Sequence, residues 1–252
     1  NSITTSSAAD APPVTHLMSH THDFFRFPHT PHIAWLASGT PRDDKVLSAD
    51  EAQSLLQHPV VVEEKLDGAN MGISFSSEAV LHVQNRGQYL NKPYGGQFSR
   101  LDEWLAIREG DLFDALGDRL ILFGEWCAAQ HSLDYETLPD WFLAFDVYDR
   151  DAQRFWSTRR RHELAQKLGL REVPRVSAGE TSLPVLTEWV QTHRSHYRLG
   201  SLEGVVIRQE DEDWLLGRAK LVRPDFVQSI EEHWRSRAIQ WNRVAWTDEA
   251  GA

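Results

Sequence analysis

Apolar and polar residues alternate along this chain in short runs, most of which have the period of β-strands. The run at 60–65 is rich in valine and ends just before Asp67-Gly68, a pair typical of turns. The runs at 120–124 and 141–148 are more continuously apolar, as strands buried on both faces are. These patterns predict strands at 60–65, 71–75, 80–83, 120–124, 141–148, 204–208 and 214–222.

Helical signals lie between these strands. Ser48 and Glu51 have the spacing of a capping box, and Gly169 is a typical helix end. The expected helices are 48–57, 98–116, 157–168, 183–194 and 224–241. Because helices and strands do not alternate regularly, their order predicts an α+β fold of mostly antiparallel sheets flanked by helices.

One large domain is the simplest organisation for a chain of 252 residues. Residues 1–14 are rich in Ser, Thr, Ala and Pro and lack the features of a secretory signal, so a flexible tail is expected there. We expect the domain to span 15–226. A helical extension over 227–252 is expected to follow, too short for an oligonucleotide-binding barrel.

The composition is that of an ordinary globular protein, with 41% hydrophobic and 25% charged residues. No run of about 18 apolar residues occurs, which argues against a membrane span. Cys127 is the single cysteine and lies in an apolar run, so it predicts a core position and no internal disulfide. A chain of this kind suits a reducing compartment, and the cytoplasm is the expected location.

The net charge of −11 argues against a continuous basic surface for nucleic acid. The cationic residues instead gather in patches, at which any nucleic acid would have to bind. These are Arg86, Lys92 and Arg100; Arg159, Arg160 and Arg161; and Arg218, Lys220 and Arg223. For 159–161 a solvated helix face is the preferred interpretation.

The segment 64–68 is the first candidate for chemistry. A lysine is nucleophilic only when part of it is neutral, and burial at a strand end or nearby cations can lower its pKa. Lys65 ends an apolar strand, and the following Asp67-Gly68 would let a nucleotide lie against it. Taken alone, the pattern fits an exposed lysine before an ordinary hairpin turn better.

Further short motifs follow Lys65 in order, and with it they resemble the covalent nucleotidyltransferases, the superfamily of ATP-dependent DNA ligases, RNA ligases and mRNA capping enzymes. The matching segments are Lys65-Leu-Asp-Gly68, Gln84-Asn-Arg-Gly87, Leu122-Phe-Gly-Glu-Trp126, Phe142-Leu-Ala-Phe-Asp-Val-Tyr148, Leu202-Glu-Gly-Val-Val206 and Arg218-Ala-Lys-Leu-Val222. One departure stands in the last motif, where Arg218 occupies a position that is commonly lysine. Arginine keeps the charge but replaces a point-like ammonium with a planar fork.

The resemblance implies a nucleotidyltransferase fold and a role for each matched residue. Lys65 would form a lysine–AMP intermediate with ATP, Glu125 would hold the ribose, and Phe145 would stack on the purine. Glu203 would bind Mg²⁺ or Mn²⁺, while Arg86, Arg218 and Lys220 would hold phosphates. Lys65, Lys220 and Glu203 are thus the expected catalytic residues, and the nucleotide-binding set is Glu64, Lys65, Asn70, Arg86, Glu125, Phe145, Glu203, Arg218 and Lys220. From the residues alone, Glu125 could equally be a surface carboxylate, and Phe145 fits a core position better.

Within the superfamily, Asn70 favours the RNA ligases of the phage type, in which an Asn follows the first motif where DNA ligases and many capping enzymes favour Arg. An amide can bond a 2′-hydroxyl, which distinguishes RNA from DNA. The expected substrate is RNA with 5′-phosphate and 3′-hydroxyl ends, with no membrane and no stable protein partner. The alternatives are a capping guanylyltransferase, an ATP-dependent DNA ligase, or a non-catalytic module that binds nucleotides or RNA ends.

The histidines near the start of the chain do not predict a metal site. No cysteine accompanies them and prolines intervene, so a flexible polar entry segment is expected. They are His16, His20, His22, His29 and His32.

Overall fold

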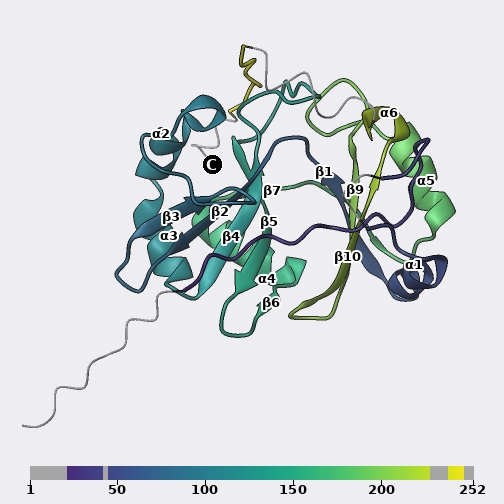
Figure 1. Cartoon of the computed structure of the whole chain (residues 1–252), viewed down its shortest axis with the longest axis horizontal. Coiled ribbons are helices and arrows are strands. Elements are labelled where there is room, and N and C mark those ends of the chain that lie inside the picture. The colour runs from purple at the N-terminus through teal and green to yellow at the C-terminus, as the bar shows by residue number, and fades with distance from the viewer. Residues whose placement is uncertain (1–21, 42–44, 228–237, 247–252) are drawn as a thin grey trace, which may run out of the picture.

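Two β-sheets stand side by side, and helices cover their outer faces (Figure 1). The computed structural model describes residues 22–41, 45–227 and 238–246. The expected tail at 1–14, His16 and His20, and part of the last expected helix lie outside these residues. None of the helices among the described residues combines the length and the apolar character needed to cross a membrane.

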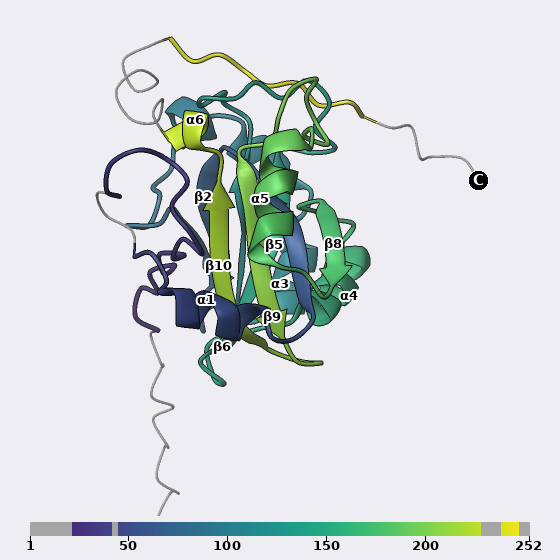
Figure 2. The same ribbon diagram turned by 90° about the vertical axis from the view of Figure 1, so that its right-hand side faces the viewer.

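The first sheet has the strand order β10-β9-β1-β8, and every pair in it is antiparallel. Its strands are β1 (Val60–Lys65), β8 (Arg175–Gly179), β9 (Gly204–Glu210) and β10 (Leu215–Val222). Helices α1 (Ala49–Leu56) and α5 (Leu183–Thr192) lie across its outer side, as Figure 2 shows. Leu55 of α1 and Leu186 of α5 pack there on the valines of β1.

The second sheet has the order β3-β2-β4-β5-β6, and β7 pairs in parallel with β5. Its strands are β2 (Ala69–Phe75), β3 (Leu81–Gln84), β4 (Leu120–Trp126), β5 (Phe142–Asp149), β6 (Arg154–Phe155) and β7 (Arg171–Glu172). The helical elements that belong with this sheet are the 3₁₀ turn η1 (Gly96–Phe98), α2 (Leu101–Ala106), α3 (Glu109–Leu116) and α4 (Thr158–Leu168). Trp104, Trp126 and Phe142 fill the core between helices and sheet.

The capping signals read from the sequence are present. Ser48 caps α1 in a reciprocal capping box with Glu51. Ser157 caps α4, whose other end is Gly169 in the left-handed conformation that glycine adopts without steric cost. The predicted strands are likewise present, while the short strands β6, β7 and β8 were not predicted. Cys127 is buried, as expected.

The single helix expected over 98–116 is wrong, because the chain breaks between α2 and α3. A continuous helix would need the carbonyl of Trp104 to accept from the backbone N–H of Arg108. Instead that carbonyl accepts from the Arg108 guanidinium at 2.7 Å, which also lies over the Trp104 ring. The Arg108 N–H donates to Leu105, one residue closer, and so ends the first helix.

The helix expected over 224–241 is confirmed at its start, where α6 is Pro224–Val227. It is wrong at 238–241, since 238–246 is extended, with bridges from Trp241 to Ala129 and from Val244 to Leu138. Residues 228–237 lie outside the described residues. The polar, flexible entry segment is wrong as well for the residues from 22 onward. There Phe27 and Ile33 are buried, and Phe27 packs its ring against Phe123.

Candidate functional site

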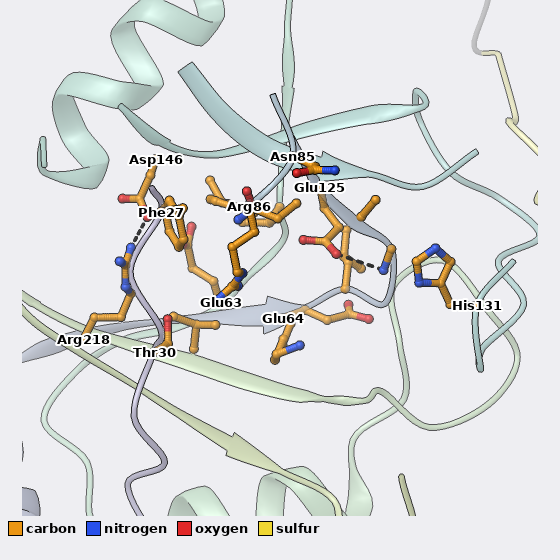
Figure 3. A pocket seen from close by; sticks show the side chains of 18 of the residues that line it. Phe27, Thr30, Glu63, Glu64, Asn85, Arg86, Glu125, His131, Asp146 and Arg218 are labelled. Carbon is orange, nitrogen blue, oxygen red and sulfur yellow. Dashed lines mark hydrogen bonds and ion pairs between the residues drawn. The ribbon is translucent and has the colours of Figure 1, made fainter. Parts of the chain in front are cut away.

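A cavity of about 420 Å³ opens between the two sheets. Strands β1, β9 and β10 supply one wall, β2, β4 and β5 supply the other, and Phe27 of the N-terminal segment closes one side (Figure 3). Most of the predicted site residues line it, namely Glu64, Lys65, Asn70, Arg86, Glu125, Phe145 and Arg218. The fold thus brings together residues that are far apart in the sequence.

Lys65 is the last residue of β1, and its ammonium contacts Glu203, which stands just before β9. The distance from Lys65 Nζ to Glu203 Oε1 is 2.5 Å. Burial disfavours the charge of Lys65, but Glu203, Glu125 and Asp67 outweigh burial and raise its pKa. The lowered pKa considered for this lysine is therefore not found, because the carboxylates outweigh burial. Burial in turn raises the pKa of Glu203 to about 8, against the opposing pull of Lys65.

The Asp67-Gly68 turn holds the chain tightly beside the second sheet. A Cβ on Gly68 would lie 2.6 Å from the carbonyl oxygen of Trp126, so only glycine fits. The Gly68 N–H donates to Glu125 at 2.9 Å. The Asp67 carboxylate accepts from the backbone N–H groups of Ser132 and Leu133, both at 2.7 Å. The turn is thereby fixed between β4 and the loop that follows it.

Glu125 and Asn70 are direct neighbours across the β2–β4 pair. Burial raises the pKa of Glu125 to about 7, although Lys65 opposes the shift. The Asn70 Oδ1 atom is buried and has no hydrogen-bond partner among the described residues. Buried polar atoms normally have partners, so this oxygen is available to a bound molecule.

Glu64 lies on the same strand as Lys65, with its side chain buried. One carboxylate oxygen accepts from the backbone N–H of His196 at 2.9 Å and lies 2.8 Å from the ring Nδ1 of that residue. The other oxygen, Oε1, has no partner among the described residues. Like Asn70, Glu64 therefore offers an unused acceptor at the cavity.

Phe145 occupies β5 with one side in the core and one side on the cavity. Its ring packs on Phe27 with centroids 5.4 Å apart. Its backbone carbonyl accepts from Arg161 at 2.7 Å and from Arg208 at 3.3 Å. Phe145 thus packs partly in the core, as expected, while its role as a flat face for a base stays a prediction.

The cationic residues of the cavity gather near Phe27. Arg86 lies 5.7 Å from the centre of that ring and 3.3 Å from His29 Nδ1. Arg218 lies 4.7 Å from the same centre and is ion-paired with Asp146. Burial lowers the pKa of the Arg218 guanidinium. Two arginines therefore face the space in which phosphates would need neutralisation.

Lys220 stands two residues beyond Arg218 on β10, opposite Val206, which lines the cavity. Residues two apart on a strand share a face, so its backbone position faces the same space. Lys220 itself is not among the residues that line the cavity. Its backbone is fixed instead, because its N–H donates to Pro31 and its carbonyl accepts from Ile33.

The solvated face expected for 159–161 is wrong for Arg161. Its side chain is 4% exposed and pairs with Glu63 at 2.6 Å and with Glu172 at 2.8 Å. A buried guanidinium requires such partners, because an unpaired charge is costly away from water. Arg159 is the exposed member of the group.

Sequence reasoning missed a buried ionic network in the wall of the cavity. Arg208 pairs with Asp146 at 2.8 Å and approaches Glu63 at 3.9 Å, so it joins the two sheets. The available signal was a charged residue inside an otherwise apolar strand, such as Glu63 in β1 or Arg208 in β9. His131 was missed too. It lines the cavity, its Nε2 lies 2.8 Å from Gln97 Oε1, and burial lowers its pKa.

The donor set suits a divalent cation only in part. Glu203 keeps one buried oxygen, Oε2, without a partner among the described residues, and carboxylate oxygens are the donors that Mg²⁺ and Mn²⁺ prefer. No group of three or more candidate ligands occurs in the part of the chain that the structure describes. A cation would thus take one or two carboxylates from the protein and its remaining oxygens from water or phosphate, as Mg²⁺ commonly does.

Comparison with known proteins agrees with this geometry. The model of the RNA ligase family matches residues 58–222. Among solved structures, a Naegleria gruberi RNA ligase mutant in its apo form has a TM-score of 0.61 and 17% identity, covering 86% of this chain and 62% of that one. The same ligase with pyrophosphate gives 0.60 and 18%, covering 86% and 63%. A mutant with ATP and Mn gives 0.58 and 18%, covering 70% and 53%.

The chain therefore spans between 53% and 63% of the length of these ligases. At such low identity the likeness establishes the fold, which is the predicted α+β nucleotidyltransferase fold. The comparison with curated proteins gave no match.

Proposed function

Because the chain belongs to the RNA ligase family, we propose that it is an ATP-dependent RNA ligase that acts through a lysine–AMP intermediate on Lys65. The observation that carries this proposal is the position of Lys65, half-buried at the edge of the cavity and 2.5 Å from Glu203. A structural lysine would not need a cavity with arginines on one side and an aromatic face on another. The Naegleria gruberi ligase of the same fold has been solved with ATP and Mn, which agrees with ATP and a divalent cation as cofactors here.

In the first step, the amine of Lys65 attacks the α-phosphate of ATP. A bond forms between Nζ and the α-phosphorus. The bond from the α-phosphorus to the oxygen that bridges the α- and β-phosphates breaks, and pyrophosphate leaves. The attacking amine must first lose its proton. The Glu203 carboxylate can accept it, since Oε1 is within hydrogen-bond distance of the ammonium.

Arg86 and Arg218 neutralise the phosphates in this step, and we assign Lys220 the same task from the neighbouring position on β10. A bound Mg²⁺ or Mn²⁺, held by Glu203, would stabilise negative charge on the transferring phosphate. Glu125 accepts from a ribose hydroxyl, and Phe145 presents its face to the base. Glu64 offers its free oxygen to the nucleotide.

In the remaining steps, the AMP passes from Lys65 to the 5′-phosphate of an RNA strand. A 3′-hydroxyl then attacks that phosphate, the new phosphodiester forms and AMP leaves. Asn70 supports RNA over DNA, because its unpartnered Oδ1 can accept from a 2′-hydroxyl. Ends with a 5′-phosphate and a 3′-hydroxyl are thus the proposed substrates.

Labelling with α-³²P nucleotides tests the covalent step. The protein is incubated with labelled ATP or GTP and Mg²⁺, and acid-stable label on the chain is measured. We expect label from ATP, and none on a Lys65→Ala variant. Lys167→Ala is the matched control, because Lys167 is exposed on α4. Equal labelling of Lys65→Ala would overturn the proposal, while label from GTP alone would favour a capping guanylyltransferase.

Ligation of defined nicks tests the substrate class. Duplexes with a 5′-phosphate are offered with either RNA or DNA at the 3′-hydroxyl side, and sealed product is measured. We expect sealing of the RNA nick, with a smaller difference between the two substrates in an Asn70→Ala variant. Sealing of DNA at the same rate as RNA would indicate a DNA ligase, and labelling without any sealing would contradict the ligase assignment.

A further inference from the structure

The segment 238–246 lies against the loop that follows β4. The Gln130 N–H donates to Gln240 at 2.7 Å, and the Asn242 N–H donates to Ala128 at 2.9 Å. The Arg243 N–H donates to Tyr135 at 3.0 Å. The segment thus runs alongside the loop in an extended conformation.

Asn242 is the one side chain of this segment that is buried within the described residues. Its Oδ1 accepts from the Tyr135 N–H at 2.8 Å, while its Nδ2 donates to Cys127 at 2.8 Å and to Ala129 at 3.3 Å. One amide therefore joins both ends of the loop. Because these partners are buried backbone groups, removing the amide would leave them unsatisfied.

Tyr135 links the loop to the Asp67-Gly68 turn. Its ring is 1% exposed, and its hydroxyl accepts from the Asp67 N–H at 2.8 Å. The Asp67 carboxylate in turn accepts from Ser132 and Leu133 of the same loop. The turn after Lys65 is therefore held by the loop both through its backbone and through its side chain.

We propose that Asn242 is a positioning residue for Lys65, acting through Tyr135 and the Asp67-Gly68 turn. This inference rests on the proposed function, since it assigns the segment a task in lysine–AMP formation. Asn242 is not among the residues that line the cavity, and its side-chain hydrogen bonds go to Tyr135, Cys127 and Ala129. It holds the loop after β4 in place. The Tyr135 hydroxyl and the backbone N–H groups of that loop bind Asp67, and the Asp67-Gly68 turn in turn sets the direction of Lys65.

Displacement of a nucleophile by about 1 Å can slow a reaction about 100-fold without altering how tightly the substrate is held. We call the contacts from Asn242 through Tyr135 to Asp67 the relay. Its loss should lower the rate constant for adenylylation and leave the KM for ATP nearly unchanged. The base contact proposed for Phe145 comes from β5 and does not pass through Asn242, so it remains.

Single-turnover adenylylation tests the inference with Asn242→Ala and Tyr135→Phe. The second variant removes only the hydroxyl that accepts from Asp67. Arg243→Ala is the matched control, because Arg243 is adjacent, is exposed, and takes part in the relay through its backbone alone. We expect rate constants about 10- to 100-fold lower in the two variants and unchanged in the control. The fraction of molecules that finally become labelled should stay as in the wild type.

A reduced labelled fraction with an unchanged rate constant would mean that Asn242 only maintains folding, and it would overturn the inference. So would wild-type kinetics in both variants. Hydrogen exchange of the Asp67 amide, followed by NMR, tests the relay without any activity. It should quicken in both variants and not in Arg243→Ala. If the wild type forms no adduct, the proposed function fails, and an unchanged exchange rate would then separately overturn the relay.

Discussion

Lys65 Nζ lies 2.5 Å from Glu203 Oε1, across the antiparallel pair of β1 and β9. The pairing of Lys65 with Gly204 places the neighbouring Glu203 beside the end of β1. Lys65 is therefore held as an ammonium by the carboxylate that, in the proposed mechanism, also accepts its proton. That mechanism requires this pair to be disturbed, which incoming phosphates and a cation would do.

The first prediction concerns the proton on Lys65. In a Glu203→Gln variant the main opposing charge is lost while burial remains, so the pKa of Lys65 should fall. The ¹³C shift of lysine Cε, titrated by NMR, measures this directly. Lys167 serves as an internal reference that should not move. A Lys65 pKa unchanged or higher in the variant would show that Glu203 does not hold the proton.

The second prediction concerns stability and pH. Burial raises the pKa of Glu125 to about 7, above the 4.5 of an ordinary glutamate. Between these values the folded protein binds a proton that the unfolded chain has released, so stability falls as pH rises from about 4.5 through 7. Glu125→Gln removes this dependence. The variant should match the wild type near pH 5 and exceed it at pH 8 by about 1–3 kcal/mol.

Urea unfolding at both pH values measures the difference. Glu78→Gln is the control, because Glu78 is exposed in the turn before β3 and should show no pH-dependent gain. A gain for Glu125→Gln that is equal at pH 5 and pH 8 would mean that the carboxyl is not the titrating group.

The third prediction concerns Gly68, the glycine of the turn after Lys65. In Gly68→Ala the new methyl group would lie 2.6 Å from the Trp126 carbonyl oxygen, a backbone atom that cannot easily yield. We expect the turn to shift and lysine–AMP formation to slow about 100-fold. Gly110→Ala is the matched control. It meets nothing within 4 Å and lies inside α3, where alanine should stabilise the helix by about 0.5–1 kcal/mol.

Much of the site follows from local patterns in the sequence. The strand before Lys65 and the turn after it were predictable, since valine-rich alternation and an Asp-Gly pair are both short-range signals. The ordered motifs then indicated Arg86, Glu125 and Phe145, which do line one cavity. These local signals do not predict which residues from distant parts of the chain contact each site residue.

Arg161 illustrates the limit. Three arginines follow one another at the start of α4, and the helix pattern alone does not say which of them turns inward. The choice depends on Glu63, which is 98 positions earlier in the chain. The relay from Asn242 to Asp67 is similar, because each contact joins residues from separate loops. Such pairings arise from the tertiary fold, and no periodic pattern in the sequence indicates them.

The last prediction tests this buried network. In Arg161→Ala, Glu63 and Glu172 lose their partner in a place where neither can be well solvated. Breaking a buried ion pair from one side typically costs about 3–5 kcal/mol, so the variant should unfold at clearly lower urea concentration. The carbonyl of Phe145 also loses the 2.7 Å bond that Arg161 donates, and the KM for ATP should rise as the ring shifts.

Arg159→Ala is the control on the same helix. Its guanidinium pairs with Glu163 and Asp213 at the exposed surface, where water replaces the lost contacts. Its urea midpoint and KM should stay close to those of the wild type. Equal effects of the two substitutions would mean that the loss comes from helix α4 as a whole. A double variant, Glu63→Gln with Arg161→Met, removes both charges together and should recover part of the stability, because the cost lies in the unpaired carboxylate rather than in the absence of the pair.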